Sequence, residues 1–137
     1  MTSRVLVDTN VLVDLLTDDP LWANWSSDAF CACSDHARMV IDTPVYGELA
    51  VRYDSVEELE QMIHAADLER EHVPWTAAFL AGKAFADYRQ AGGTRRSPLP
   101  DFYIGAHAAV TGMSLLTRDA ARYRTYFPTV ELITPDV

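Results

Sequence analysis

Four short runs of apolar residues at successive positions divide the chain, and longer segments with helical spacing separate them. The runs lie at residues 5–7, 39–41, 114–117 and 130–133, and a weaker one lies at 72–73. Strands that are covered on both faces show such continuous runs, whereas strands with one wet face alternate apolar and polar residues. The pattern therefore predicts an α/β fold, a three-layer α/β/α sandwich around a mostly parallel sheet of about four to five strands.

Helix-start signals precede the segments between these runs. They are Asp19-Pro20, Thr43-Pro44, the capping box of Ser55 and Glu58, Thr76, and Pro100. Each supplies an N-cap side chain or a first-turn proline. Trp22 and Trp25 follow the first signal at an i, i+3 spacing, and we expect them in the core or at an interface. Gly92 and Gly93 are expected to stop the helix that starts at Thr76.

The length and composition suit one globular domain. The chain has 137 residues with no internal repeat, low-complexity tract or linker, so residues 1–137 are predicted to form a single domain. Hydrophobic residues make up 49% and charged residues 23%, which excludes disordered and collagen-like chains. No apolar run approaches the roughly 20 residues of a membrane helix, and the opening MTSRVLVDTN lacks the zones of a signal peptide. We therefore expect a cytoplasmic protein with no membrane contact.

The charge is strongly acidic but unevenly distributed. The formal net charge of −9 argues against a protein that coats DNA electrostatically. Residues 1–82 hold 4 basic and 15 acidic residues, a net charge of −11, whereas residues 83–137 hold 7 basic and 5 acidic ones, a net charge of +2. The C-terminal part can therefore still face a polyanion such as a nucleic acid.

Two cysteines lie close together in the sequence. Cys31 and Cys33 are two residues apart, a spacing that is poorly suited to a disulfide, and two cysteines are too few for a disulfide scaffold, so reduced thiols are expected. With His36 they suggest a soft-metal site, but a closed zinc site needs a fourth ligand, and no obvious one lies nearby. A partly buried helix end is the favoured interpretation.

Four carboxylates occupy positions where a parallel sheet collects its ligands, outside the carboxyl ends of the strands. Asp8 directly follows the first apolar run, and Glu48 lies about one turn into the helix after the second. Asp101 stands in the first turn after Pro100, and Asp119 follows the third run after one residue. Most of the other acidic residues are expected on solvated faces. Any one of the four alone is more often a helix cap than a catalytic group, but together they indicate a site.

Gathering four carboxylates requires compensation, because two like charges about 4 Å apart repel by roughly 4 kcal/mol at an effective dielectric constant near 20. Helix N-termini supply part of the positive charge and a divalent cation supplies the rest. Oxygen ligands without histidine or thiolate favour Mg²⁺ or Mn²⁺ over zinc. Such an ion also binds phosphate oxygens, so the pattern points to metal-assisted phosphodiester hydrolysis.

Four segments follow one another in order over nearly the whole chain. They are VLVDTNVLVD, TPVYGELAVRY, LPDFYIGAHA and SLLTRDAARYRTYFPTVELITP. Together they closely resemble a PIN-domain ribonuclease of the VapC toxin type. The resemblance implies a PIN-like α/β/α sandwich, Mg²⁺- or Mn²⁺-dependent cleavage of RNA, a homodimer, and neutralisation by a cognate antitoxin of a type II toxin-antitoxin pair.

The family's four acids fall on the same residues that the strand ends select. They are Asp8, Glu48, Asp101 and Asp119. The hydroxyl that commonly accompanies the last acid falls on Thr117, and the polar positions after the first acid fall on Thr9 and Asn10. Related toxins often have Asn where Asp119 stands, so its weight as a ligand stays open. Asp14 is expected to face a neighbouring helix or solvent.

The resulting hypothesis is in-line attack by a metal-bound water on a backbone phosphate of RNA. Asp8 and Asp101 would be the inner metal ligands, while Glu48 and Asp119 would complete the shell, hold a second ion or orient the water. Thr117 would donate to a bound water or phosphate, although a strand-end hydroxyl can equally satisfy local backbone groups. Attack by water predicts products with a 5′-phosphate and a 3′-hydroxyl.

Several basic and polar residues are candidates for binding the substrate. Arg95 and Arg96 precede Asp101 on the GGTRRSPLP loop and could bind phosphates at the rim of the acidic pocket. Arg118, beside Asp119, could do the same, and Asn10 is the fourth candidate for binding the substrate. Ordinary solvent exposure is the alternative for the arginines, which include Arg122 on the other side of Asp119. Tyr103, Tyr126 and His107 are expected to pack in the core more than to bind RNA.

Two other protein classes fit poorly. Haloacid-dehalogenase-type phosphatases have a second acid where this chain has Asn10. Receiver domains need an acidic pair after the first strand and a lysine after the last strand. The single lysine, Lys83, lies in a helical pattern away from the strand ends. Both classes are therefore disfavoured.

Two further alternatives stay open. The acidic pocket could bind a metal or a basic peptide without catalysis, or the chain could be a housekeeping PIN nuclease without a toxin role. For a toxin, we expect an antitoxin whose basic tail covers the pocket, because an arginine can replace the missing cation and exclude RNA.

Overall fold

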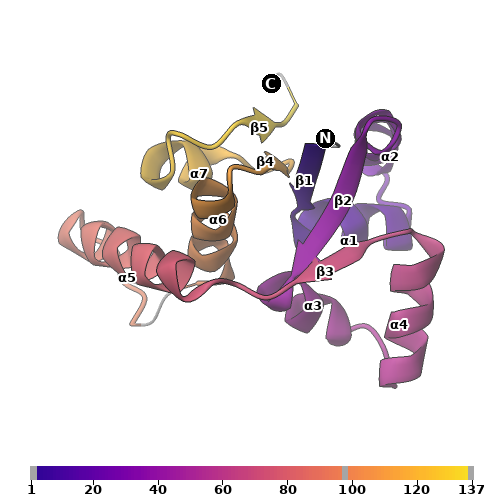
Figure 1. Cartoon of the computed structure of the whole chain (residues 1–137), viewed down its shortest axis with the longest axis horizontal. Coiled ribbons are helices and arrows are strands. Elements are labelled where there is room, and N and C mark those ends of the chain that lie inside the picture. The colour runs from indigo at the N-terminus through magenta and orange to yellow at the C-terminus, as the bar shows by residue number, and fades with distance from the viewer. Residues whose placement is uncertain (1–2, 97–98, 136–137) are drawn as a thin grey trace.

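The computed structural model describes residues 3–96 and 99–135 and contains one five-stranded, all-parallel sheet (Figure 1). The strands are β1 (Ser3–Val7), β2 (Ala37–Asp42), β3 (Glu69–Glu71), β4 (Ser114–Leu116) and β5 (Leu132–Ile133). Their order across the sheet is β3-β2-β1-β4-β5. Residue Val5 of β1 lies opposite Met39 of β2 on one side and Ser114 of β4 on the other. The predicted fold class is confirmed.

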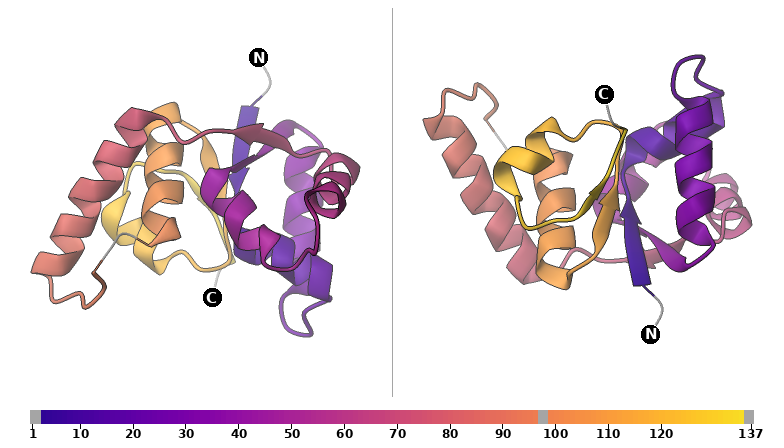
Figure 2. Two further views of the ribbon diagram at one scale, coloured as in Figure 1. Left: turned by 90° about the horizontal axis from the view of Figure 1, so that it is seen from below. Right: turned by 90° about the horizontal axis from the view of Figure 1, so that it is seen from above.

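Helices cover both faces of the sheet. They are α1 (Thr9–Thr17), α2 (Ala23–Ser34), α3 (Thr43–Ala50), α4 (Val56–Ala65), α5 (Trp75–Gln90), α6 (Pro100–Thr111) and α7 (Ala121–Tyr126). Figure 2 shows α1 and α2 on one side of the sheet and α5, α6 and α7 on the other. In Figure 1, α3 lies below the ends of the strands, between these two groups. Within the described part of the chain, no helix is long and apolar enough to span a membrane.

The apolar runs form the centre of the core, as their continuous pattern predicts. Leu6 and Val7 of β1, Ile41 of β2 and Leu115 and Leu116 of β4 are fully buried. Burial of each such side chain stabilises the fold by about 1.5–3 kcal/mol. The three central strands are therefore held firmly, and the residues that directly follow their ends are held in fixed positions.

The predicted strand at residues 72–73 is wrong. The strand is β3, Glu69–Glu71, and it pairs with β2 at the edge of the sheet. Its side chains are charged: Glu69 pairs with Arg38 of β2, and Glu71 with Arg4 of β1. Charged residues that pair with β2 and with the more distant β1 stand at this edge in place of apolar ones, so an apolar run does not mark the strand.

Two of the predicted helix starts are confirmed and three are shifted. Ser55 caps α4 and Pro100 opens α6, whereas α3 has Asp42 and not Thr43 as its N-cap. Asp19 instead closes a turn, since its Oδ1 accepts from the backbone N–H groups of Leu21 and Trp22 at 2.9 Å, and α2 begins at Ala23. Helix α5 begins at Trp75 with Pro74 as its N-cap, one residue before Thr76.

Smaller differences concern boundaries and glycines. The strands β4 and β5 are shorter than the runs at 114–117 and 130–133. Trp25 packs against the core as expected. After α5, Gly92 adopts a φ of 98°, which a residue with a side chain rarely adopts, so this glycine ends the helix as predicted.

Candidate metal-dependent nuclease site

Asp8 joins the end of the central strand to the start of α1. Its backbone N–H donates to the carbonyl of Leu116 in β4 at 2.9 Å, and its Oδ1 caps α1 by accepting from Thr9 N at 2.7 Å. Its Oδ2 accepts from the hydroxyls of Thr117 and Tyr123, each at 2.9 Å. These bonds hold a carboxylate that is only 5% exposed in one orientation.

The environment makes ionisation of Asp8 unfavourable. Burial raises the pKa of Asp8 from 3.8 to about 6, and the charge of Asp101 raises it further, while the hydrogen bonds from Thr117, Tyr123 and Thr9 oppose the shift. Burial disfavours the charged form because the protein solvates it less well than water does. A nearby cation would therefore stabilise the ionised form of Asp8.

Glu48 reaches the same region from α3. The hydroxyl of Thr9 donates to Glu48 Oε1 at 2.7 Å, which links the carboxylate to the first residue of α1. Partial loss of hydration raises the pKa of Glu48, and the charges of Asp101 and Asp42 add to the shift. The side chain itself remains at the surface.

Asp101 stands in the first turn of α6, whose N-terminus favours a negative charge. Loss of hydration raises its pKa, the Arg122 guanidinium opposes the shift, and the charge of Asp119 adds to it. The contact with Arg122 is long, with Nη1 at 3.4 Å from Asp101 Oδ2. The carboxylate thus has a weak partner of its own and acidic neighbours.

Asp119 is placed by the hydroxyl of Thr117. That hydroxyl donates to Asp8 Oδ2 and accepts from Asp119 N at 3.1 Å and from Asn10 Nδ2 at 3.2 Å. Asn10 in turn accepts from the backbone N–H of Arg118 at 3.3 Å. Thr117 is fully buried and its hydroxyl bonds local backbone, which was one of its two expected roles, and it also contacts a site carboxylate; its donation to a bound water or phosphate stays a prediction.

The four acids that the sequence selects line one pocket of about 290 Å³. The pocket is formed by Asp8, Thr9, Asn10, Val13, Glu48, Asp101, Arg118 and Asp119. Its lining residues come from the end of β1, from α1, α3 and α6, and from the segment that follows β4. The expected convergence of residues that are far apart in the sequence is therefore present.

The donor set fits a hard divalent cation, which prefers carboxylate oxygens. Between residues 3 and 96 and between 99 and 135, no three His, Cys, Asp or Glu side chains lie close enough together to hold an ion as they stand. Asp8 is fixed, whereas Glu48 and Asp119 are exposed and can turn by rotation about their side-chain bonds. Ion binding thus requires rotation of the outer carboxylates toward Asp8.

Arg118 lines the pocket but is committed to another partner. Its Nε donates at 2.7 Å to Asp14 Oδ2, which also accepts from Ser26 Oγ at 2.8 Å. The guanidinium lies over the ring of Trp22, 5.5 Å from its centroid. Asp14 therefore faces α2, as expected. Arg118 neutralises its buried charge, so it has less freedom to bind a substrate than its position in the sequence indicates.

Arg95 and Arg96 are not brought to the acidic pocket. Both are exposed, neither lines the pocket, and the carbonyl of Arg95 accepts from Arg89 Nη1 at 2.6 Å at the end of α5. The expectation that their loop reaches the rim finds no support in their position. Residues 97–98 of this loop lie outside the described residues.

Sequence reasoning missed Tyr123, which contacts Asp8 directly. Tyr123 is 1% exposed, and burial together with the charges of Asp8 and Asp101 raises its pKa well above the ordinary value. Its phenol therefore stays a donor to Asp8. A tyrosine on the buried face of the short helix α7 looks like an ordinary core residue in the sequence, and no local signal marks its hydroxyl.

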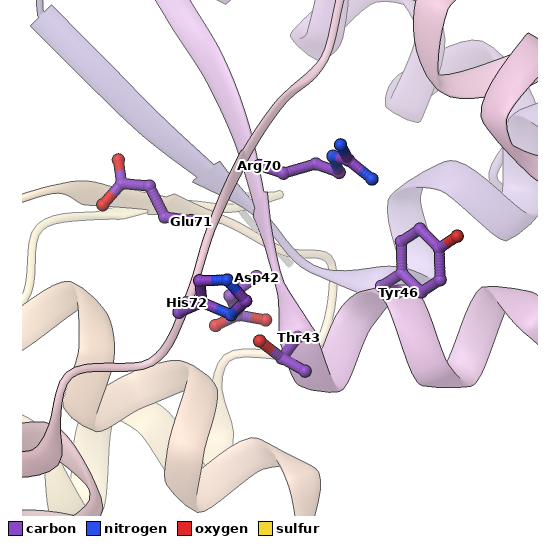
Figure 3. Close-up of a pocket in the computed structure, with 6 residues that line it drawn as sticks. All are labelled: Asp42, Thr43, Tyr46, Arg70, Glu71 and His72. Carbon is purple, nitrogen blue, oxygen red and sulfur yellow. The ribbon is translucent and has the colours of Figure 1, made fainter.

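A polar pocket that is separate from the acidic one, of about 370 Å³, lies near the ends of β2 and β3 (Figure 3). Asp42, Arg70, Glu71 and His72 are among its lining residues. Beside it His107, expected to be a packing residue, is fully buried with Nδ1 at 3.0 Å from Asp42 Oδ2 and Nε2 at 3.6 Å from Glu71 Oε1. His107 packs in the core as predicted, but it also ties α6 to the first residues of α3 through Asp42.

The two cysteines are free. Cys31 is exposed, and burial raises the pKa of the Cys33 thiol. Both lie in α2, near its C-terminal end, as the favoured interpretation predicts.

Comparisons with known proteins agree with this arrangement. The model of the PIN domain family matches residues 5–128, a stretch that contains all four acids. A search of curated protein sequences finds no match.

Solved structures share the fold at low sequence identity. VapBC2 from Rickettsia felis, bound to a DNA fragment from its promoter, matches with a TM-score of 0.72 and 18% identity over 97% of this chain and 99% of that one. VapBC-1 from nontypeable Haemophilus influenzae matches with a TM-score of 0.71 and 16% identity, over 96% and 97% of the two chains. A toxin-antitoxin complex from Klebsiella pneumoniae matches with a TM-score of 0.70 and 20% identity, over 96% and 97%. With the match of the family model and the acid-lined pocket at the strand ends, the chain belongs to the PIN domain family.

Proposed function

We propose that the chain is a Mg²⁺- or Mn²⁺-dependent endoribonuclease that hydrolyses phosphodiester bonds of RNA. PIN domains are generally nucleases that use divalent metal ions. The observation that carries the proposal is the pocket in which four carboxylates converge around Asp8, whose pKa is raised to about 6. Carboxylates that line one pocket are suited to binding a divalent cation and, through it, a phosphate, once the outer ones rotate toward Asp8.

Asp8 and Asp101 would hold the ion, with Glu48 and Asp119 completing its surroundings or holding a second one. The bound ion would supply positive charge at the scissile phosphate and lower the pKa of water. The chain's own contribution is orientation. The bonds from Thr117 and Tyr123 keep Asp8 aimed into the pocket, and Thr9 keeps Glu48 at its edge, where this carboxylate can orient a water or accept its proton.

We further propose that the protein is the toxin of a toxin-antitoxin pair. Three of the similar structures are described as VapBC or toxin-antitoxin complexes, which supports a protein partner for this chain. The partner we expect is an antitoxin with a basic tail, since an arginine placed among the four carboxylates would neutralise them and exclude RNA. The homodimer stays a prediction, and the exposed side chains of Trp75 and Phe79 on α5 are available for such a contact.

The activity is tested by incubating purified, antitoxin-free protein with RNA and Mn²⁺, and repeating with EDTA. We expect cleavage that EDTA abolishes, with 5′-phosphate and 3′-hydroxyl ends. Asp8→Asn should lower the rate by about 100-fold or more, because even the outer partners of metal ligands are worth 10–100-fold. Asp28→Asn, which removes an exposed acid from α2 outside the pocket, is the matched control and should cleave like the wild type.

Two results would redirect the proposal. A folded wild type that leaves RNA intact with either ion would favour the non-catalytic acidic binding module. Cleavage without a growth defect on expression, and without rescue by a small partner, would favour a housekeeping PIN nuclease. Mapping cleavage sites on total cellular RNA would then identify the RNA that is cut.

A further inference from the structure

A second pocket opens beside the acidic one and shares two of its walls. It has a volume of about 390 Å³, and Asp101 and Asp119 line both pockets. The other walls come from Tyr88 of α5 and from Arg122 and Tyr126 of α7. Figure 1 shows these three helices, α5, α6 and α7, gathered on one side of the sheet. A chain bound across the acidic pocket would therefore meet this second pocket next.

The wall of the second pocket is aromatic and well packed. The rings of Tyr88 and Tyr126 both pack against Phe102, with centroids 5.6 Å away in each case, and they lie 6.3 Å from each other. Phe102 is fully buried, while the two tyrosines are half-buried and line the pocket. The tyrosines are thus backed by the core, which lets them present a fixed apolar surface at a low entropic cost.

Arg122 is held over this aromatic wall with its charge available. Its guanidinium lies 5.5 Å from the ring centroids of both Tyr88 and Phe102, and its contact with Asp101 is long, at 3.4 Å. Its side chain is 32% exposed. Arg118, by contrast, donates at 2.7 Å to the buried Asp14. Arg122 is therefore the arginine of the two that can bind a substrate phosphate without abandoning a buried partner.

We propose that this second pocket, formed by Tyr88, Arg122 and Tyr126, binds the nucleotide next to the cleaved phosphate of a single-stranded RNA. An aromatic surface stacks on a base, and a guanidinium pairs with its phosphate. Stacking requires an unpaired base, because a base inside a duplex is already stacked. Every base has a flat face, so the pocket selects an unpaired strand with little preference among the four bases. This inference rests on the proposed RNA cleavage, since it assigns the part of the substrate that lies beside the acidic pocket.

The test uses short single-stranded RNAs in which one nucleotide at a time, around the mapped cut, is replaced by an abasic one. For the wild type, kcat/KM should fall about 5- to 150-fold when the abasic position is directly next to the cut, which is the range expected for one base stacked on an aromatic ring. Tyr126→Leu should lower kcat/KM for intact RNA and should no longer respond to that abasic position. Tyr103→Leu is the matched control, since Tyr103 lies on α6 and lines a different pocket. It should keep the wild-type response.

Arg122→Gln is a second variant that does not depend on the tyrosine packing. It should lower kcat/KM for intact and abasic RNAs by the same factor and reduce the slope of log(kcat/KM) against log salt concentration by about 0.7, which corresponds to one lost phosphate contact on a single strand. Melting temperatures of all variants show whether they fold.

The outcomes separate the two proposals. A wild type that does not cut RNA removes the proposed function, and this pocket assignment with it. A wild type that cuts RNA but tolerates abasic nucleotides on both sides of the cut overturns the pocket assignment alone. An abasic penalty that persists in Tyr126→Leu, or one that disappears in Tyr103→Leu, overturns it as well, because the base would then lie elsewhere.

Discussion

Replacing Asp8 with asparagine should stabilise the metal-free protein at neutral pH. The pKa of Asp8 is raised to about 6 in the folded state against 3.8 for an ordinary aspartate, and a pKa unit corresponds to about 1.4 kcal/mol, so ionised Asp8 destabilises the fold by about 3 kcal/mol. Because the folded pKa is the higher one, the stability that protonated Asp8 contributes is fully present below about pH 4 and is lost as the pH rises through about 6. Asparagine carries no charge at any pH and still caps a helix well.

The expected size of the effect follows from this shift. One weakened hydrogen bond in Asp8→Asn costs about 1 kcal/mol, which leaves a net gain of about 2 kcal/mol at pH 7.5. For 137 residues, an unfolding entropy of about 2.1 cal/mol/K per residue converts this gain to a rise in Tm of about 7 °C. Near pH 4.5 the variant and the wild type should be about equally stable, because ionisation of Asp8 in the unfolded chain has by then removed about 1 kcal/mol of the wild type's stability, which matches the cost of the weakened hydrogen bond.

The assay is thermal unfolding followed by circular dichroism, with EDTA present, from pH 4.5 to 8. Asp28→Asn, which changes an exposed acid, should follow the wild type at every pH. If Asp8→Asn melts at or below the wild-type temperature at pH 7.5, ionised Asp8 is not strained in the folded protein, and the electrostatic case for a cation at this site loses its basis.

Three other expectations concern stability. Mn²⁺ should raise the Tm of the wild type through preferential binding to the folded state, and it should raise that of Asp8→Asn much less; equal shifts would place the ion elsewhere. A methyl group on Gly105 would lie 2.4 Å from the buried ring of Phe127, so Gly105→Ala should lower the free energy of unfolding by about 1–3 kcal/mol in chemical denaturation. Gly82 faces open space on α5, so Gly82→Ala should raise the free energy of unfolding by up to about 1 kcal/mol in the same measurement. His107→Leu should cost about 3 kcal/mol because it removes the ring nitrogen that contacts buried Asp42, and His107→Asn should recover part of that loss in the same measurement.

The sequence predicted the central strands and the four acids because both depend on short-range pattern. Buried parallel strands require continuous apolar runs, which mark β1, β2 and β4 directly. Each acid lies within a few residues of a strand end or in the first turns of a helix, so Asp8, Glu48, Asp101 and Asp119 could be placed once the strands were placed. Parallel topology then brings these ends to one edge.

The features that the sequence did not reveal depend on contacts between distant segments. Arg118 is committed to Asp14, 104 positions away, and Tyr123 donates to Asp8 across 115 positions. The edge strand β3 is stabilised by ion pairs with its neighbours, so its charged residues look like a loop. Arg95 and Arg96 are near Asp101 along the chain, but a loop of that length can lead away from the site, and nearness in sequence was a poor guide to where they lie.

The pairing of β1 also bears on how the chain folds during synthesis. A ribosome makes β1 before β4, yet one edge of β1 pairs with β4, with Val5 opposite Ser114. That edge therefore stays uncovered until residue 114 has been made. Asp119 and Tyr123, which complete the surroundings of Asp8, are translated later still. A nascent chain that stalls before β4 therefore exposes an open edge of apolar strand, which is a target for chaperones and proteases and prone to aggregate, and its acidic pocket is still incomplete.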